Sequence, residues 1–323
     1  MRRTWIALPI LVLFAAPLAA KELSLAEVNA ADFRDGQKSQ SPAVLIKAQV
    51  LLDRSRFSPG TIDGKRGENF SNALRAFQKE NGLEENGELN AETWSKLSQN
   101  AEPAVIEYTI TAQDVKGPFA DDIPEKMEKK AALKRLDYTG ADELLAERFH
   151  MDEDLLTSLN PGKKFDKAGT VITVANVNEK PAALNTKLEK IEVDKQRKIV
   201  RALGADGKLI AVYPASIGSE EKPAPSGTLK VARVAKNPTY TYNPDFQFRG
   251  VKAKEEFKIA PGPNNPVGSV WIALNEKTYG IHGTPDPEKV GKVASHGCVR
   301  LTNWDALALA GMVKKGTVVE FLD

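Results

Sequence analysis

The sequence contains the stretch Ile281-His282-Gly283-Thr284, and after a short interval Ser295-His296-Gly297-Cys298-Val299-Arg300-Leu301. These two stretches hold the single cysteine of the chain and two of its three histidines. Cysteine and histidine are the side chains best suited to nucleophilic catalysis near neutral pH. We therefore interpret this segment as the centre of the molecule and predict that Cys298 is a nucleophile.

The residues around Cys298 fit that chemistry. A free thiol is mostly protonated near pH 7, so it needs a neighbouring base or aligned N–H groups. His282 can accept the thiol proton. Because Gly297 has no side chain, the backbone at Cys298 can come close to a substrate carbonyl, and the N–H groups of Gly297 and Cys298 can bind the oxyanion of a tetrahedral intermediate. The segment predicts an acyl-transfer site.

This pattern resembles the L,D-transpeptidases with a YkuD-type catalytic domain. That family shares a strand reading roughly Ile-His-Gly-Thr and then a Ser/Thr-His-Gly-Cys box. Two more stretches are similar to the family, Ala224 to Thr228 and Pro261 to Leu274, which leads into Tyr279-Gly280. The resemblance covers residues 188–323. With the modules described below it implies a multidomain α+β protein, in which small helical and βααβ modules precede a mainly β catalytic domain.

The resemblance also implies residue roles. Cys298 is expected to be the acylated nucleophile, His282 the general base and acid, and the carbonyl of Gly283 the group that orients the imidazole. Three further residues, Ser295, His296 and Arg300, are expected to contact substrate. A guanidinium suits a peptide rich in carboxylates because it binds them bidentately. No cofactor is implied.

The implied substrate is a peptidoglycan tetrapeptide stem. Cys298 would attack the carbonyl of the third residue and expel the terminal D-alanine. Transfer to a second diaminopimelate gives a 3-3 cross-link, transfer to a lysine of a wall-attached lipoprotein anchors that protein, and transfer to water is carboxypeptidase activity. The competing interpretation is a non-catalytic peptidoglycan-binding protein, which would leave the His282/Cys298 pair without a purpose.

Residues 1–20 predict a signal peptide. Met1-Arg2-Arg3 precedes an apolar run from Trp5 to Leu18, and Ala19-Ala20 are small. The run is short for a transmembrane span, which favours a signal peptide, and a membrane anchor is the alternative. We expect export to the periplasm, and a lone cysteine allows no internal disulfide there.

Residues 41–99 predict a three-helix domain. Apolar residues recur at helical spacing within 44–52 and 70–77, Gly60 to Gly64 is a turn cluster, and a short third helix carries Trp94. The pattern resembles the peptidoglycan-binding-like domain. The same apolar positions would be needed for any helical core, so they give no direct evidence of ligand binding.

Residues 136–178 predict a strand–helix–helix–strand module that resembles a LysM repeat, a small module that binds N-acetylglucosamine-containing glycans. Its first strand is expected near Tyr138 and its last at Val171 to Val174. The usual Gly-Asp-Thr-Leu opening of the repeat appears here as Ala141 to Leu144. Before this module, 105–110 alternates weakly like a strand, and 125–135 is a charged helical segment without a functional interpretation.

From Lys190 the hydrophobic period becomes two, which is typical of strands. The expected strands are 191–193, 199–203, 209–214, 229–234, 267–274, 280–282 and 318–322. One helix begins after Thr302 as its cap, with Leu307, Ala308 and Met312 predicted on one face. The loop from Tyr240 to Pro263 is either a flap beside the active site or a plain surface loop.

Three other functions fit the sequence less well. His282, His296 and Cys298 could be zinc ligands, but a closed structural site needs a fourth ligand. Ser219 to Lys222 matches the Ser-x-x-Lys of penicillin-binding proteins without a companion Lys-Thr-Gly, so we take it as a chance match. A formal charge of only +2 argues against a nucleic-acid partner.

Overall fold

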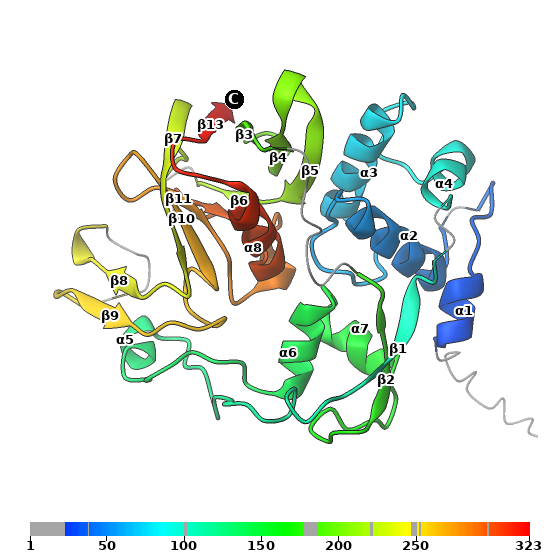
Figure 1. Cartoon of the computed structure of the whole chain (residues 1–323), viewed down its shortest axis with the longest axis horizontal. Helices are drawn as coiled ribbons and strands as arrows, with labels where there is room; N and C mark the ends of the chain where they lie inside the picture. Colours follow the sequence, from blue (N-terminus) through cyan, green and yellow to red (C-terminus); the bar gives the residue numbers. More distant parts are fainter. Residues whose placement is uncertain are drawn as a thin grey trace, which may run out of the picture.

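The computed structural model describes residues 23–37, 39–99, 102–177, 187–219, 222–246, 251, 253–295 and 297–323. The expected signal peptide and His296 lie outside these residues. The C-terminal half of the chain forms a large β-sheet, and helices of the N-terminal half lie beside it (Figure 1). The predicted α+β class is confirmed.

The sheet has nine strands in the order β5-β4-β3-β13-β7-β10-β11-β12-β6. Their bounds are β3 (Lys190–Asp194), β4 (Ile199–Leu203), β5 (Leu209–Pro214), β6 (Ser216–Ile217), β7 (Gly227–Lys236), β10 (Val270–Leu274), β11 (Gly280–His282), β12 (Val299–Arg300) and β13 (Val318–Leu322). Neighbours are antiparallel except β13 with β3 and β11 with β12, which are parallel. The period of two along each strand directs alternate side chains into a core of Val, Ile and Leu.

Helix α8 (Asn303–Met312) covers one face of this core (Figure 1). The side chain of Thr302 caps its N-terminus by accepting from the N–H of Asp305 at 3.2 Å. The buried face of the helix differs from the predicted one: Leu309 and Ala306 are fully buried, whereas Leu307 is 39% exposed. The first turn is buried as well and carries polar side chains, which bind other modules.

The three-helix domain consists of α2 (Pro42–Arg54), α3 (Glu68–Glu80) and α4 (Ala91–Leu97). Ser41 caps α2 and Pro42 occupies its first position, where a missing N–H costs nothing. The turn cluster is held from α2, because the buried Gln49 amide accepts from the N–H of Gly64 at 2.8 Å and donates to Asp63 at 2.8 Å. The expected three-helix arrangement is therefore present.

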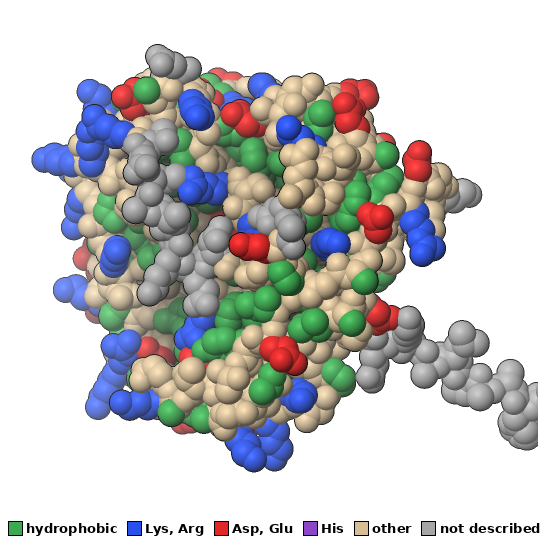
Figure 2. Space-filling view, turned by 45° about the vertical axis from the view of Figure 1, so that its right-hand side comes forward, with side chains coloured by type: hydrophobic (Ala, Val, Ile, Leu, Met, Phe, Trp, Pro, Cys, Tyr) green, Lys and Arg blue, Asp and Glu red, His purple; other side chains and the backbone are tan. Residues whose placement is uncertain are grey.

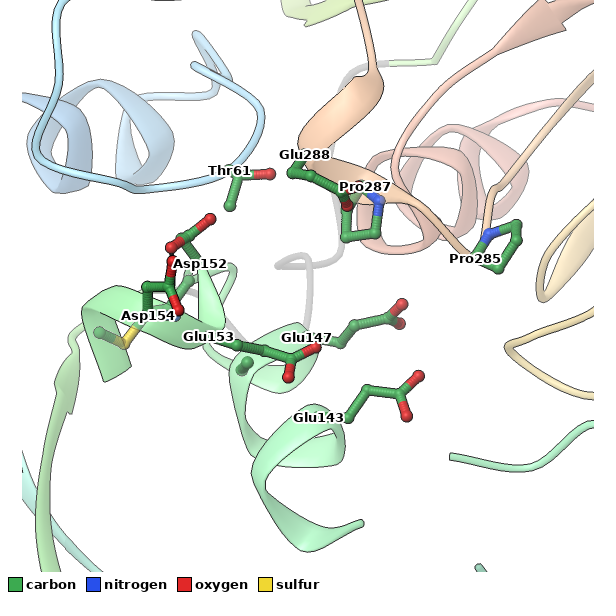
Figure 3. A pocket seen from close by; sticks show the side chains of 11 residues that line it. Thr61, Glu143, Glu147, Asp152, Glu153, Asp154, Pro285, Pro287 and Glu288 are labelled. Carbon is green, nitrogen blue, oxygen red and sulfur yellow. Dashed lines mark hydrogen bonds between the residues drawn. The ribbon is translucent and has the colours of Figure 1, made fainter. Parts of the chain in front are cut away.

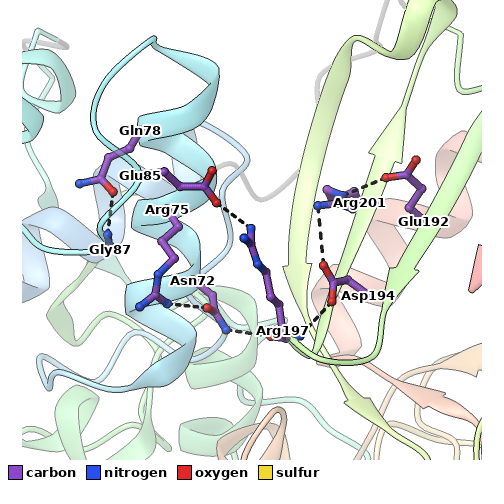
Figure 4. A network of polar contacts seen from close by, with 9 residues as sticks. All are labelled: Asn72, Arg75, Gln78, Glu85, Gly87, Glu192, Asp194, Arg197 and Arg201. Carbon is purple, nitrogen blue, oxygen red and sulfur yellow. Dashed lines mark hydrogen bonds and ion pairs between the residues drawn. The ribbon is translucent and has the colours of Figure 1, made fainter. Parts of the chain in front are cut away.

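This domain packs against the edge of the large sheet. Ile199 and Val212 of β4 and β5 belong to the same buried cluster as the helices. Ser58 donates its N–H to the carbonyl of Val212 at 2.9 Å, which continues the pairing beyond β5. Polar contacts lie beside the apolar ones. The side chain of Asn72 donates to the backbone carbonyl of Arg197 at 2.8 Å, and the guanidinium of Arg197 pairs with Glu85 at 2.6 Å (Figure 4).

The βααβ module has an unexpected first strand. β2 (Val171–Ala175) pairs antiparallel with β1 (Val105–Thr109), and α6 (Ala141–Arg148) and α7 (Glu153–Ser158) pack on this pair. The strand expected near Tyr138 was wrong, because Gly140 already caps α6 and leaves no length for a strand. The module therefore starts at about residue 105 and not at 136, and residues 110–139 are an insertion within it.

The insertion runs along the catalytic domain and contains the short helix α5 (Met127–Lys130) beside β9 (Figure 1). Leu136, fully buried, donates its N–H to Pro261 and accepts from the N–H of Asn264, both at 3.0 Å. A Cβ on Gly262 would lie 2.0 Å from the Leu136 carbonyl oxygen, so this close approach requires glycine. The insertion thereby fixes the base of the loop that follows β9.

The remaining elements are α1 (Leu25–Ala30), which joins the core of the βααβ module, and the hairpin β8 (Tyr240–Tyr242) with β9 (Phe257–Ile259). Among the described residues, no helix is both long and apolar enough to cross a membrane. Side chains of both charge signs are interspersed on the face in Figure 2.

Candidate active site

Strands β11 and β12 place the predicted catalytic residues on one face of the sheet. They pair in parallel, with His282 opposite Arg300 and Ile281 opposite Val299. Continuing this register by one residue puts Cys298 beside Gly280. Side chains alternate along a strand, so His282, Cys298 and Arg300 share one face while Ile281 and Val299 enter the core. The structure therefore places His282 on the same face as Cys298 and Arg300, which come later in the chain.

The imidazole of His282 is held by its neighbours. The side chain is 4% exposed, and its Nδ1 lies 2.6 Å from the carbonyl oxygen of Gly283. A carbonyl can only accept, so Nδ1 carries the hydrogen and Nε2 is left as the acceptor. The ring also stacks on Trp271 of β10, with 5.4 Å between centroids and 24° between planes. Trp271 faces His282 in register, a position the sequence analysis did not single out.

Electrostatics keep this imidazole neutral. Burial lowers the pKa of His282 to about 3, the positive charge of Arg300 acts in the same direction, and the bond to Gly283 opposes both. A neutral imidazole at pH 7 can accept a proton, which is what a general base requires.

The thiol of Cys298 is also uncharged at pH 7. Burial raises its pKa to about 11, while a hydrogen bond from the Gly280 backbone and the nearby Arg300 charge partly oppose this. Its Sγ lies 3.5 Å from the carbonyl oxygen of Thr278, to which the thiol donates. The resting pair is therefore thiol and imidazole, not thiolate and imidazolium, so proton removal must accompany attack.

The loop before Cys298 is fixed from within. Ser295 is 2% exposed, its hydroxyl donates to the carbonyl of Cys298, and its N–H donates to Gly218 at 3.0 Å. The hydrogen of the Ser295 hydroxyl is thus used inside the loop, and its substrate contact stays a prediction. Gly297 has φ 96°, a conformation that favours glycine. The amides of Gly297 and Cys298 remain the predicted oxyanion site, and the predicted substrate contact of His296 falls on a residue outside the described ones.

Arg300 has a free donor beside the thiol. Among the described residues, its buried Nε has no hydrogen-bond partner. Burial lowers the pKa of Arg300, and the nearby Asp286 and Cys298 oppose that shift. A buried unpaired donor is costly, so an anionic group bound here would be stabilised.

The hairpin β8–β9 reaches this site. Tyr242 is buried and stacks on Phe257 with 4.6 Å between centroids, which makes the hairpin a packed unit. Tyr240 lies close enough to Cys298 for a thiolate there to add to the effect of burial, and both raise the pKa of Tyr240. Of the two interpretations of this loop, the flap beside the active site is the one these contacts favour.

In the part of the chain that the structure describes, which leaves out His296, no three His, Cys, Asp or Glu side chains are arranged to hold a metal ion. A cavity of about 190 Å³ lies away from Cys298, between Thr61, the helices α6 and α7, and the segment Pro285–Glu288 (Figure 3). Its lining is acidic.

Two family models match the chain. Residues 189–321 match YkuD, the L,D-transpeptidase catalytic domain, and residues 43–97 match the model described as "Putative peptidoglycan binding domain". The "Putative L,D-transpeptidase YkuD" of Bacillus licheniformis is 48% identical over 59 residues, which is 18% of this chain and 36% of that protein. The "Probable L,D-transpeptidase YbiS" of Escherichia coli K12 is 30% identical over 186 residues, 56% of this chain and 60% of that protein.

Among solved structures, an L,D-transpeptidase from Mycobacterium smegmatis aligns with a TM-score of 0.35 and 19% identity, over 50% of this chain and 76% of that one. The chain spans less than two thirds of the length of the two curated relatives above. The predicted resemblance is confirmed by the family models: residues 189–321 match the YkuD model of the L,D-transpeptidase catalytic domain, and residues 43–97, which precede them, match the peptidoglycan-binding model.

Proposed function

We propose that the protein is a cysteine-dependent L,D-transpeptidase that acts on peptidoglycan stem peptides through a thioester on Cys298. The observation that carries the proposal is the imidazole of His282, which is neutral, bonded through Nδ1 to Gly283, and on the same sheet face as the thiol. Both family matches fit a wall substrate.

The reaction starts from the uncharged pair. As Sγ of Cys298 attacks the carbonyl carbon, Nε2 of His282 takes the thiol proton. The tetrahedral oxyanion is bound by the amides of Gly297 and Cys298. The carbon–nitrogen bond to the leaving D-alanine then breaks, and the imidazolium returns its proton to that nitrogen, which leaves a thioester and a neutral imidazole.

The second half repeats these steps in reverse order. An acceptor amine attacks the thioester carbonyl and loses a proton to His282. The carbon–sulfur bond breaks, and the proton passes to the departing sulfur, which restores the thiol. A diaminopimelate amine gives a 3-3 cross-link and a lipoprotein lysine gives an anchored protein. Water as acceptor would make the enzyme an L,D-carboxypeptidase.

Arg300 supports a carboxylate-bearing substrate. Its buried Nε, which has no partner among the described residues, belongs to a side chain on the same face as Cys298, where a stem-peptide carboxylate would provide an acceptor. Tyr240 of the hairpin would cover the bound peptide from the other side.

The N-terminal part of the proposal concerns location. The peptidoglycan-binding domain would hold the enzyme to the wall, and the LysM-like module would add contacts to glycan strands. The signal sequence proposed at residues 1–20 would export the chain to the periplasm.

Muropeptide analysis by mass spectrometry tests the proposal. Cells that express the wild type should gain 3-3 cross-links or shortened stems, whereas Cys298→Ala should match cells without the protein. A carbapenem should add its mass to the Cys298 peptide alone, and more slowly in His282→Gln. Identical muropeptide profiles for wild type and Cys298→Ala would leave only the non-catalytic wall-binding alternative.

A further inference from the structure

We propose that Asn303 and Glu147 are positioning residues for His282, so that the βααβ module is part of the framework of the active site. The functional consequence rests on the proposed transpeptidase reaction. The structural part concerns a chain of contacts from α6 to the imidazole and stands on geometry alone.

The amide of Asn303 joins two loops of the catalytic domain. Its Oδ1 accepts from the N–H of Thr284 at 3.2 Å and from the N–H of Ser269 at 3.0 Å. Thr284 follows Gly283, whose carbonyl holds Nδ1 of His282 at 2.6 Å. One side-chain oxygen therefore fixes the backbone that orients the imidazole.

The fit around this oxygen is tight. A Cβ on Gly283 would lie 2.2 Å from Oδ1 of Asn303, and a Cβ on Gly268 would lie 2.1 Å from it. Real Cβ atoms do not approach an oxygen so closely, so both positions require glycine. Because the amide fills the space between the two loops, a change in its position moves the Gly283 backbone.

The other end of the same amide is held from the βααβ module. Nδ2 of Asn303 donates to both carboxylate oxygens of Glu147, at 2.9 Å and 3.1 Å. Tyr138, from the insertion, donates its hydroxyl to Glu147 at 3.1 Å. Glu147 is 8% exposed, and burial raises its pKa to about 8. The orientation of the amide is fixed from both ends: Nδ2 donates to Glu147 and to the carbonyl of Pro263 at 3.3 Å, which leaves Oδ1 for the N–H groups of Thr284 and Ser269.

Apolar packing alone does not hold this junction. Glu147 borders the acidic cavity of about 190 Å³ that separates α6 and α7 from Pro285–Glu288 (Figure 3). The hydrogen bonds between Glu147 and Asn303 therefore lie beside a gap in the packing between the module and the catalytic domain. A displacement of the module would therefore move Asn303 and, through it, the backbone at Gly283.

An exchange of the two side chains tests the proposal. In Asn303→Asp the Nδ2 donor is replaced by a carboxyl oxygen that faces Glu147. Two carboxyl groups this close resist ionising together, and the repulsion between them grows as the pH is raised to 9. We expect carbapenem acylation of Cys298 to slow on the order of 10- to 100-fold, because small displacements of a catalytic group cost that much. In Asn303→Asp with Glu147→Gln, the donor and acceptor are exchanged and the net charge is that of the wild type, so the rate should recover to within a few-fold.

A matched control separates positioning from docking. Asn264 makes the same kind of contact between the domains, donating to Glu143 at 2.7 Å, and within the described residues no hydrogen bond joins its side chain to the loop of His282. Asn264→Asp should therefore loosen the module while acylation stays within a few-fold of wild type. A loss equal to that of Asn303→Asp would overturn the proposal, as would a double variant no faster than the single one.

A second readout does not depend on activity. The Nδ1 proton of His282, assigned by its absence in His282→Gln, should give a protected downfield NMR signal in the wild type. We expect it to be lost in Asn303→Asp, kept in Asn264→Asp and restored in the double variant. If the wild type fails to react with the carbapenem, the proposed function is wrong, but the NMR signal still tests the structural proposal. An unchanged signal in Asn303→Asp would refute the structural proposal.

Discussion

The pH dependence of Cys298 acylation is the most direct check on the resting state of the site. The pKa of His282 is lowered to about 3 by burial and by Arg300, and burial raises the pKa of Cys298 to about 11. An imidazole with a lowered pKa stays neutral until the pH falls to that lower pKa. Between pH 5 and pH 8 the imidazole should therefore be a competent base throughout, and the thiol should remain protonated.

The magnitude follows from the two pKa values. With a pKa of about 3, roughly 99% of the imidazole is neutral at pH 5; with the ordinary value of about 6.5, only about 3% would be, so the rate would fall about 25-fold from pH 7 to pH 5. The thiolate of Cys298 at pH 7 should be only about one part in 10,000. A flat profile thus distinguishes this site from one with an ordinary histidine.

The assay is stopped-flow acylation by a carbapenem from pH 5 to pH 8, with the adduct on Cys298 verified by mass spectrometry. Alkylation by iodoacetamide, which needs the thiolate, should rise about tenfold per pH unit from pH 7 to pH 10. His282→Gln is the control, because it should slow acylation while leaving the slope of alkylation unchanged. A fall in acylation with a midpoint near pH 6.5, or fast alkylation at pH 6, would refute the reasoning and indicate a preformed thiolate–imidazolium pair.

Three further changes have expected outcomes. Gly283→Ala places a Cβ 2.2 Å from Oδ1 of Asn303, so unfolding should become easier by on the order of 1–3 kcal/mol and acylation slower, as measured by urea titration and stopped flow. In Arg300→Lys the side chain loses Nε and its planar fork of donors, so KM for a carboxylate-bearing tetrapeptide should rise more than kcat falls. An equal rise in KM for a substrate that lacks this carboxylate would contradict the assignment. Burial raises the pKa of Asp305 to about 7, so folding takes up a proton, and the free energy of unfolding should fall as pH rises from about 4 to 7. In thermal melts Asp305→Asn should show a smaller fall in stability over this pH range. Equal falls in the variant and the wild type would exclude Asp305 as the cause.

The sequence predicted those parts of the molecule in which local pattern and chemistry agree. The period of two gave the strands of the large sheet, and Thr302 gave the start of α8. The pairing of Cys298 with His282 followed from the chemistry of the two residue types and needed no knowledge of the register between β11 and β12.

The errors arose where contacts between distant segments decide the outcome. The first strand of the βααβ module was misplaced, because an insertion of about thirty residues separates β1 from the helices and only pairing with β2 identifies it. The buried face of α8 was misjudged because its first turn is covered by polar groups of other modules: Ser58 donates to Asp305 at 2.9 Å, and His150 stacks on Trp304 at 5.1 Å. Apolar periodicity carries no signal for a polar surface that is buried.

The same contacts show that the N-terminal modules also support the catalytic domain. β5 is an edge strand of the sheet, and an uncovered edge invites pairing with other chains. The three-helix domain covers it by pairing Phe57 with Val212 and by burying Ile199 and Val212 in its own core. At the first turn of α8, Glu147 accepts from the amide of Asn303, which binds the loop of His282. The catalytic domain is thus contacted by two modules that precede it in the chain: the three-helix domain covers the edge of its sheet, and in our proposal the βααβ module also positions the loop of His282.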